Sequence, residues 1–183
     1  MSDAEKYTIK ELIDRIARIN AADEWIEDIN PTQWTALSYL ARANKFSRSP
    51  SQVSDFMSAT RGTVSQTLKT LARKGLISKV RSDQDKRSIS YSITEAGISI
   101  VQKNTMLKDS LSTWSEEDLS SFRSAMEKLV RSTLKQRGLR AFGVCKTCKH
   151  HQGSNQGAYC TLLNEPLTAP ETKQICYEHA QTS

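Results

Sequence analysis

All four cysteines of the 183-residue chain lie in its last 39 residues, and their types and spacing suit metal chemistry. The spacing is Cys-x2-Cys-x11-Cys-x15-Cys, formed by Cys145, Cys148, Cys160 and Cys176. Four thiolates are a full ligand set for one tetrahedral zinc ion or one iron–sulfur cluster. The sequence therefore predicts one metal site per chain, held by these four side chains.

The kind of site stays open at this point. Zinc modules usually carry two close cysteine pairs, and here only Cys145 and Cys148 form one. An iron–sulfur cluster, either 4Fe-4S or 2Fe-2S, accepts more widely separated cysteines. A third interpretation is a set of thiols without metal, with a reversible disulfide between Cys145 and Cys148. Three histidines lie nearby but are not needed as ligands, because four cysteines suffice: His150, His151 and His179.

The segment around the cysteines, residues 141–183, has many glycines and prolines and few large apolar residues. We expect it to be loop-rich and to need a metal for its stability. The sequence shows neither a secretory signal nor an apolar run of roughly 18 residues, so we expect a cytoplasmic protein with no membrane partner. Reduced thiols in that compartment favour metal binding over structural disulfides.

The preceding residues have the pattern of a DNA-binding region. The net charge of +6 favours a polyanionic partner, with double-stranded DNA the first candidate. Helices are predicted to start at Pro31 and near Pro50, and a third to run from about residue 60 to Lys74, where Gly75 suits a left-handed end. A helix, a tight turn and a helix with a polar, basic outer face are typical of a helix-turn-helix.

A hairpin with a charged tip is predicted to follow this third helix. Residues 76–80 are predicted to form one strand, and residues 88–93, which alternate strictly, its partner. Residues 81–87 between them are mostly charged. A two-stranded wing after a recognition helix completes a winged helix. The candidates for base edges or nearby backbone are Arg61, Thr63, Ser65 and Gln66, and those for phosphate are Lys69, Lys86 and Arg87.

Helices with unpaired apolar stripes are predicted on both sides of the winged helix. A capping box of Thr8 and Glu11 would open the first, and one helix is predicted from Thr94 past Leu107. A last helix would start at Ser115. We expect these stripes to form a dimer surface. The predicted domains are residues 1–30, an N-terminal dimerisation helix; 31–94, the winged helix; 95–140, C-terminal dimerisation helices; and 141–183, a cysteine-rich metal-binding tail.

Three stretches carry a resemblance to a known family. They are Asn30-Pro31-Thr32-Gln33-Trp34, the run from Arg61 to Ile77, and Asp85-Lys86-Arg87 followed by Ile93-Thr94-Glu95-Ala96-Gly97. On these residues the chain, over roughly 5–138, resembles the MarR family of bacterial winged-helix regulators. The resemblance implies a homodimer that binds a palindromic operator through two recognition helices. The cysteine tail is not part of the family pattern.

Together these features predict a mainly α protein with a small β-wing, a winged helix-turn-helix dimer and a loop-rich metal-binding tail with four cysteines. We expect a transcriptional regulator that senses redox state or metal through an iron–sulfur cluster. One alternative is a structural zinc site combined with a small-molecule effector, since MarR proteins often bind aromatic anions. Another is a winged-helix scaffold for protein contacts. The sequence shows no acid–base constellation and no glycine-rich phosphate loop, so we expect that the protein is not an enzyme.

Overall fold

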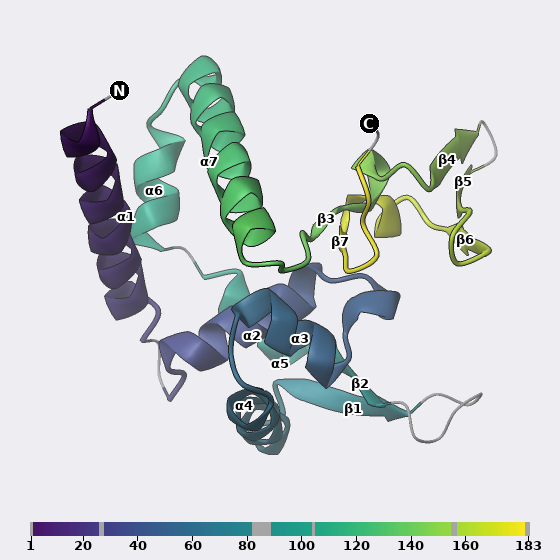
Figure 1. The fold of residues 1–183 in the computed structure, drawn as a ribbon. Helices are drawn as coiled ribbons and strands as arrows, with labels where there is room; N and C mark the ends of the chain where they lie inside the picture. Colours follow the sequence, from purple (N-terminus) through teal and green to yellow (C-terminus); the bar gives the residue numbers. More distant parts are fainter. Residues whose placement is uncertain (1, 26–27, 82–88, 104, 155–156, 182–183) are drawn as a thin grey trace.

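The computed structural model describes residues 2–25, 28–81, 89–103, 105–154 and 157–181 (Figure 1). Helices account for most of its regular structure, and this confirms the predicted mainly α fold with a β-wing. The helices are α1 (Asp3–Asp23), α2 (Pro31–Arg42), α3 (Pro50–Met57), α4 (Arg61–Arg73), α5 (Glu95–Val101), α6 (Met106–Ser112) and α7 (Glu116–Gln136).

The winged-helix core forms where α2, α3 and α4 pack together. Each of these helices has a side-chain cap: Asn30, Ser49 and Thr60 accept hydrogen bonds from the first turns of α2, α3 and α4. Two left-handed residues make the turns, Ser58 between α3 and α4 (φ 50) and Gly75 after α4 (φ 71). The fully buried apolar side chains of the three helices include Leu37, Leu40, Val53, Val64, Leu68 and Leu71.

The wing is an antiparallel pair of strands, β1 (Ile77–Arg81) and β2 (Ile89–Ile93). Ile77 lies opposite Ile93, and Arg81 lies opposite Ile89. The predicted phosphate contacts Lys86 and Arg87 fall in residues 82–88, outside the described residues.

Helix packing explains the Thr-x-x-Gly motif after the wing, which is formed by Thr94 and Gly97. The Thr94 hydroxyl caps α5 and donates to the Gly75 carbonyl at 2.8 Å. A Cβ at Gly97 would clash with the backbone carbonyl of Leu76 and with the Ile93 side chain. Only a residue without a side chain lets α5 approach the end of α4 this closely.

Two predictions about the flanking helices are wrong. The capping box of α1 is formed by Ser2 and Glu5, so the helix starts at Asp3. Thr8 lies inside the helix, where its hydroxyl donates to the Ala4 carbonyl at 3.0 Å. The single helix predicted from Thr94 past Leu107 is in fact α5 and α6, because Thr105 supplies a new N-cap just before α6.

The helices α1, α6 and α7 stand apart from the winged-helix core (Figure 1). None of the residues described in these three helices is buried. Among the described residues, no helix combines the length and the apolar character that a bilayer span requires.

The tail contains more regular structure than the loop-rich segment that was predicted. Its strands are β3 (Gly143–Val144), β4 (His151–Ser154), β5 (Gly157–Cys160), β6 (Glu165–Leu167) and β7 (Ile175–Cys176), which form a β3–β7 pair and a β4–β5–β6 sheet. Three short 3-10 turns accompany the fold, η1 (Lys45–Ser47), η2 (Cys145–Thr147) and η3 (Glu171–Lys173). Ile175 belongs to the winged-helix core, so the tail packs on that core.

Candidate nucleic-acid interface and cysteine site

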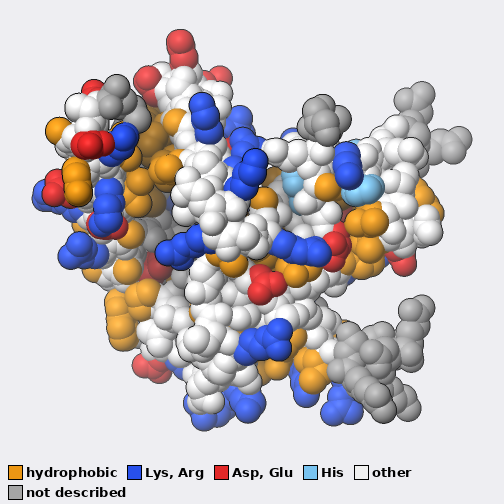
Figure 2. Space-filling view, in the orientation of Figure 1, with side chains coloured by type: hydrophobic (Ala, Val, Ile, Leu, Met, Phe, Trp, Pro, Cys, Tyr) orange, Lys and Arg blue, Asp and Glu red, His pale blue; other side chains and the backbone are white. Residues whose placement is uncertain are grey.

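Helix α4 presents the predicted DNA-contacting side chains on one exposed face. Its buried face, with Val64, Thr67, Leu68 and Leu71, packs on the core and thereby fixes how the helix is rotated. The five candidates on α4 are all exposed: Arg61, Thr63, Ser65, Gln66 and Lys69. Figure 2 shows Lys and Arg side chains gathered at the end of the molecule where Figure 1 places α4.

The side chains on this face differ in whether they already bond to other groups of the protein. The Thr63 hydroxyl lies 2.8 Å from that of Thr60 and is therefore engaged at the helix cap. Lys74 donates to the Asp28 carbonyl and holds the C-terminal end of α4 against the segment before α2. Arg61, Gln66 and Lys69 are the long donors that remain on the outer face, and these groups suit base edges and phosphates.

The four cysteines reach one region of the tail through short strands and turns. The β3–β7 pairing brings Cys145 beside β7, where its backbone N–H donates to the Gln174 carbonyl at 3.0 Å. The β4–β5 pairing places Cys160 opposite His151, whose N–H donates to the Cys148 carbonyl at 3.0 Å. All four are free thiols, and three are buried: Cys145, Cys160 and Cys176.

The thiols lie close enough to influence one another electrostatically. Burial raises the pKa of Cys145 to about 11, and the charges of Cys176, Cys160 and Cys148 contribute in the same direction. Burial also raises the pKa of Cys176. The raised pKa values keep Cys145 and Cys176 as thiols at neutral pH, and these two residues would bind metal only by losing their protons.

A backbone donor points at one of the sulfurs. The Ala180 N–H lies 3.4 Å from Cys148 Sγ. Such a bond favours a thiolate, and four thiols are the donor set of a metal or cluster site. Within the described parts of the chain, however, no three Cys, His, Asp or Glu side chains already converge tightly enough to hold an ion. His151 Nε2 is buried and lacks a hydrogen-bond partner among those same residues.

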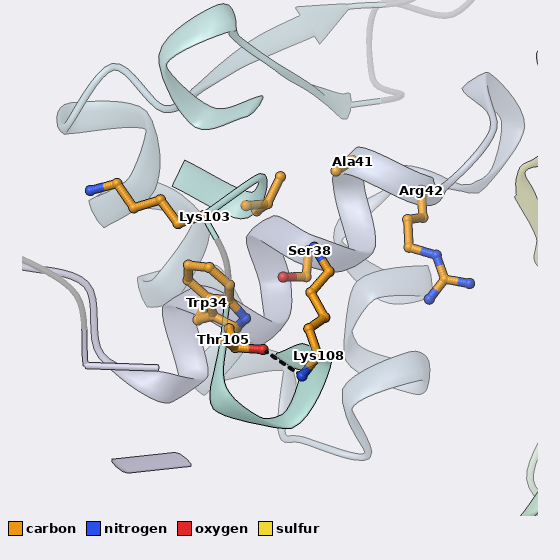
Figure 3. Close-up of a pocket in the computed structure, with 8 residues that line it drawn as sticks. Trp34, Ser38, Ala41, Arg42, Lys103, Thr105 and Lys108 are labelled. Atoms are coloured by element: carbon orange, nitrogen blue, oxygen red, sulfur yellow. Dashed lines mark hydrogen bonds between the residues drawn. The ribbon is translucent and has the colours of Figure 1, made fainter. Parts of the chain in front are cut away.

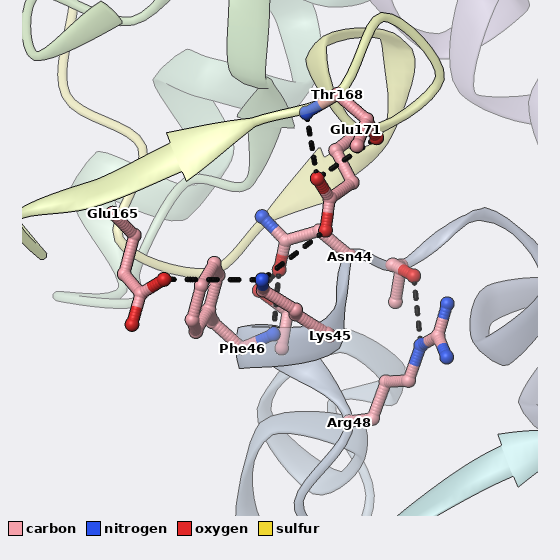
Figure 4. A network of polar contacts seen from close by, with 9 residues as sticks. Asn44, Lys45, Phe46, Arg48, Glu165, Thr168 and Glu171 are labelled. Atoms are coloured by element: carbon pink, nitrogen blue, oxygen red, sulfur yellow. Dashed lines mark hydrogen bonds and ion pairs between the residues drawn. The ribbon is translucent and has the colours of Figure 1, made fainter. Parts of the chain in front are cut away.

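Sequence reasoning missed the residues that attach the tail to the winged helix. Lys45 makes ion pairs with Glu165 at 3.9 Å and Glu171 at 3.5 Å (Figure 4). Phe142 packs edge-on against Tyr39 and Phe56, with ring centroids 5.9 and 5.2 Å apart. The one signal in the sequence was the run from Ile175 to Tyr177, an apolar and an aromatic residue around a cysteine.

A pocket of about 250 Å³ lies between α2 and the segment that joins α5 to α6 (Figure 3). The Trp34 side chain lies on one side of it. Its lining also includes three cationic residues, Arg42, Lys103 and Lys108. A pocket with an aromatic wall and positive charges suits a small anion.

Residues 27–88 match the model of the MarR family. The matched segment contains α2, α3, α4 and β1, and it ends before the cysteine tail.

Individual MarR relatives extend the comparison. An organic hydroperoxide resistance transcriptional regulator of Bacillus subtilis (strain 168) is 37% identical over 74 residues, which is 39% of this chain and 50% of the relative. The match thus spans half the length of that relative. MepR of S. aureus in its DNA-binding conformation is 26% identical, with a TM-score of 0.56, and covers 69% of this chain and 98% of its own.

A third relative shares the fold. FabT of Streptococcus pneumoniae, solved in complex with DNA, is 23% identical with a TM-score of 0.54, and covers 73% of this chain and 97% of its own. The two solved MarR structures therefore match almost completely, while a substantial part of this chain has no counterpart in them.

Proposed function

We propose that this chain is a homodimeric transcription regulator of the MarR type that binds a palindromic site on double-stranded DNA. One observation carries the proposal, the exposed row of donors on α4, which is held rigidly by a buried opposite face. MepR and FabT, which share the fold, were each solved in complex with DNA, and this supports the same activity here.

The homodimer is supported by the apolar side chains that α1, α6 and α7 leave exposed. On α1 these are Tyr7, Ile9, Leu12, Ile16 and Ile19, between 43% and 69% exposed. On α6 and α7 they include Met106, Phe122 and Val130. Contiguous apolar surface of this kind marks an interface, and a second copy with the same stripes would cover it.

For the tail, we propose a sensor of redox state or metal. Cys145, Cys148, Cys160 and Cys176 would hold an iron–sulfur cluster, which supplies a centre that responds to oxidants. The grouping of the thiols and the backbone N–H bond to Cys148 support this assignment.

A second candidate function is a DNA-binding regulator that responds to a small molecule and not to redox state or metal. The four cysteines would then hold a structural zinc ion, and the effector would be a small aromatic anion in the pocket beside Trp34. Its three cationic lining residues favour this alternative. A scaffold for protein contacts is less well supported, because the donors on α4 suit DNA better than an apolar partner.

Operator binding by protein purified without oxygen tests the proposal. We expect affinity for a selected palindrome to fall steeply as salt rises, because phosphate contacts release counterions. An iron–sulfur cluster would give absorption near roughly 400 nm, together with bound iron and sulfide, and DNA affinity should change on exposure to air. A colourless protein with one zinc per chain favours the second candidate. Affinity that is unaffected by salt would contradict DNA binding itself.

A further inference from the structure

We propose that Tyr177, in the tail, is a positioning residue for DNA binding that fixes the winged helix relative to helix α7. It does so as part of an aromatic joint, which consists of Tyr39, Phe56, Phe142 and Tyr177. None of these four residues belongs to α4 or to the wing. The inference rests on the proposed function of the chain as a DNA-binding dimer, and it does not depend on what the four cysteines hold.

The aromatic joint brings both ends of the tail against α2 and α3. Tyr39 of α2 and Phe56 of α3 stack with their ring centroids 4.3 Å apart. Phe142, at the start of the tail, packs edge-on against both of these rings. Tyr177, near its other end, packs edge-on against Phe142 at 5.4 Å. Aromatic pairs at such distances contribute stability beyond the area that they bury, so the four rings hold the tail on the two helices.

Hydrogen bonds and a charged group fix Tyr177 in this joint. Its hydroxyl donates to Asp55 of α3 at 3.0 Å, and its backbone N–H donates to the Ser47 hydroxyl oxygen at 2.8 Å. The Arg140 guanidinium lies over its ring, 4.8 Å from the centroid, and also pairs with Glu178 at 3.0 Å. Tyr177 therefore contacts α3, the turn η1 and the segment that leaves α7.

The start of the tail is short and firmly connected to α7. Helix α7 is followed by a left-handed Gly138 (φ 63), and the Leu139 N–H donates back to the Leu134 carbonyl at 2.9 Å. Phe142 follows four positions after Gly138. Four residues span at most roughly 14 Å, so the end of α7 stays near α3 while the aromatic joint is closed. Figure 1 shows the tail beside the winged-helix core at this end of α7.

Helix α3, to which Tyr177 is bonded through Asp55, is in turn tied to the recognition helix α4. The Ser54 hydroxyl of α3 donates to the Ala59 carbonyl at 2.6 Å, in the turn that leads to α4. Val53 of α3 and Val64 of α4 are fully buried in the same core. Because these two helices are packed as one unit, the aromatic joint sets the orientation of α4 relative to α7.

The distance between its two recognition helices decides which DNA a dimer can bind. Each α4 would enter the major groove at one half-site, and the separation of the half-sites must match the separation of the two helices. The proposed dimer surface includes α7, and the aromatic joint connects each winged helix to its own α7. The joint therefore restricts the dimer to one spacing of half-sites, and a loosened joint admits others.

Two substitutions of Tyr177 in the full-length protein test this role. Tyr177→Ala removes the ring and its hydroxyl, and Tyr177→Phe removes only the hydroxyl that reaches Asp55. The probes are a palindromic duplex, selected from a random pool by the unsubstituted protein, and the same duplex with one base pair inserted at its centre. We expect the unsubstituted protein to prefer the selected duplex at least about fivefold, and Tyr177→Ala to lose most of that preference. Tyr177→Phe should lose part of it. Fluorescence anisotropy measures both affinities.

Tyr159→Ala is the matched control, because Tyr159 is an exposed tyrosine of β5 in the same tail. It should keep the full preference for the selected duplex. The slope of log affinity against log salt should be the same in all variants, since none of them removes a phosphate contact. Hydrogen exchange adds a readout without DNA. The Asn44 amide, which donates to the Ile175 carbonyl at 2.9 Å, should exchange faster in Tyr177→Ala than in Tyr159→Ala.

A folded Tyr177→Ala protein with an undiminished preference for the selected duplex would overturn the role of Tyr177 and leave DNA binding standing. Weaker binding of both duplexes by the same factor overturns it too, because a general structural defect lowers both affinities alike. If a circular dichroism melt shows that Tyr177→Ala is unfolded, Tyr177→Phe decides, and an unchanged preference there defeats the proposal. An unsubstituted protein that selects no duplex from the pool refutes the proposed regulator itself, and this inference with it.

Discussion

Gln66 and Lys69 lie three residues apart on the exposed face of α4, and we expect them to make different kinds of contact with DNA. The amide of Gln66 can form two hydrogen bonds to an adenine edge in the major groove. The ammonium group of Lys69 is a point charge that suits a phosphate and carries no sequence information.

Substituting each residue by alanine should separate these roles. Gln66→Ala should lose about 1–3 kcal/mol of discrimination at one operator position, because a base-edge contact is removed. Lys69→Ala should weaken binding to all sequences alike and reduce the slope of log affinity against log salt by about one. Fluorescence anisotropy on the operator and its single-base variants, at several salt concentrations, measures both.

Lys135→Ala, an exposed lysine near the end of α7, is the control and should change neither quantity. A uniform loss of affinity for Gln66→Ala would place its side chain on the backbone and not on a base.

The residue types along α4 decided which of its side-chain positions could be predicted from the sequence. The alternation of polar and buried positions along α4 predicted its exposed face correctly, because Val64, Leu68 and Leu71 leave little choice of rotation. Phe142 carried no such pattern. It packs on Tyr39 and Phe56, which lie far earlier in the chain, and no local periodicity reports a contact over that separation.

At the scale of elements, β7 joins the tail to the winged-helix core. Ile175 is 7% exposed and packs in the same cluster as Leu37 and Leu40 of α2. Its backbone also bridges to Ala43. The glycine-rich composition of the tail suggested a segment apart from the core, and it hid this apolar anchor.

Ile175→Ala should therefore destabilise the whole winged helix and not the tail alone. Loss of a buried isoleucine side chain costs about 2–5 kcal/mol, seen as a lower urea midpoint by circular dichroism. Leu162→Ala, an exposed leucine in the same tail, should shift stability by less than about 0.5 kcal/mol. A change that small for Ile175→Ala would show that the tail docks without supporting the core.

At the scale of the whole molecule, α1, α6 and α7 have apolar surface that one chain leaves uncovered. The sequence predicted these stripes from their helical spacing, although it misplaced the start of α1 and joined α5 to α6. Those boundaries depend on which of several Ser and Thr residues caps a helix. The residues that cap α1 and α6 are Ser2 and Thr105, and the sequence pattern did not single them out.

Ile16→Glu, on the apolar stripe of α1, should convert the dimer to monomers, because it places a charge in the buried interface. Arg18→Glu introduces the same side chain two residues away on the opposite side of the helix and should leave the dimer intact. Analytical ultracentrifugation measures the assembly state, and operator affinity should fall with Ile16→Glu because two half-sites are no longer bound together. A dimeric Ile16→Glu protein would move the interface away from α1.

The place of Ile175 in the core also bears on how the protein is made. Synthesis proceeds from the N-terminus, and a growing chain folds what has already emerged. Here the recognition helix leaves the ribosome early, but its core gains a buried side chain only when residue 175 has followed. A chain cut short before residue 175 should therefore have its recognition helix on an incomplete core and should unfold more readily than the longer chain.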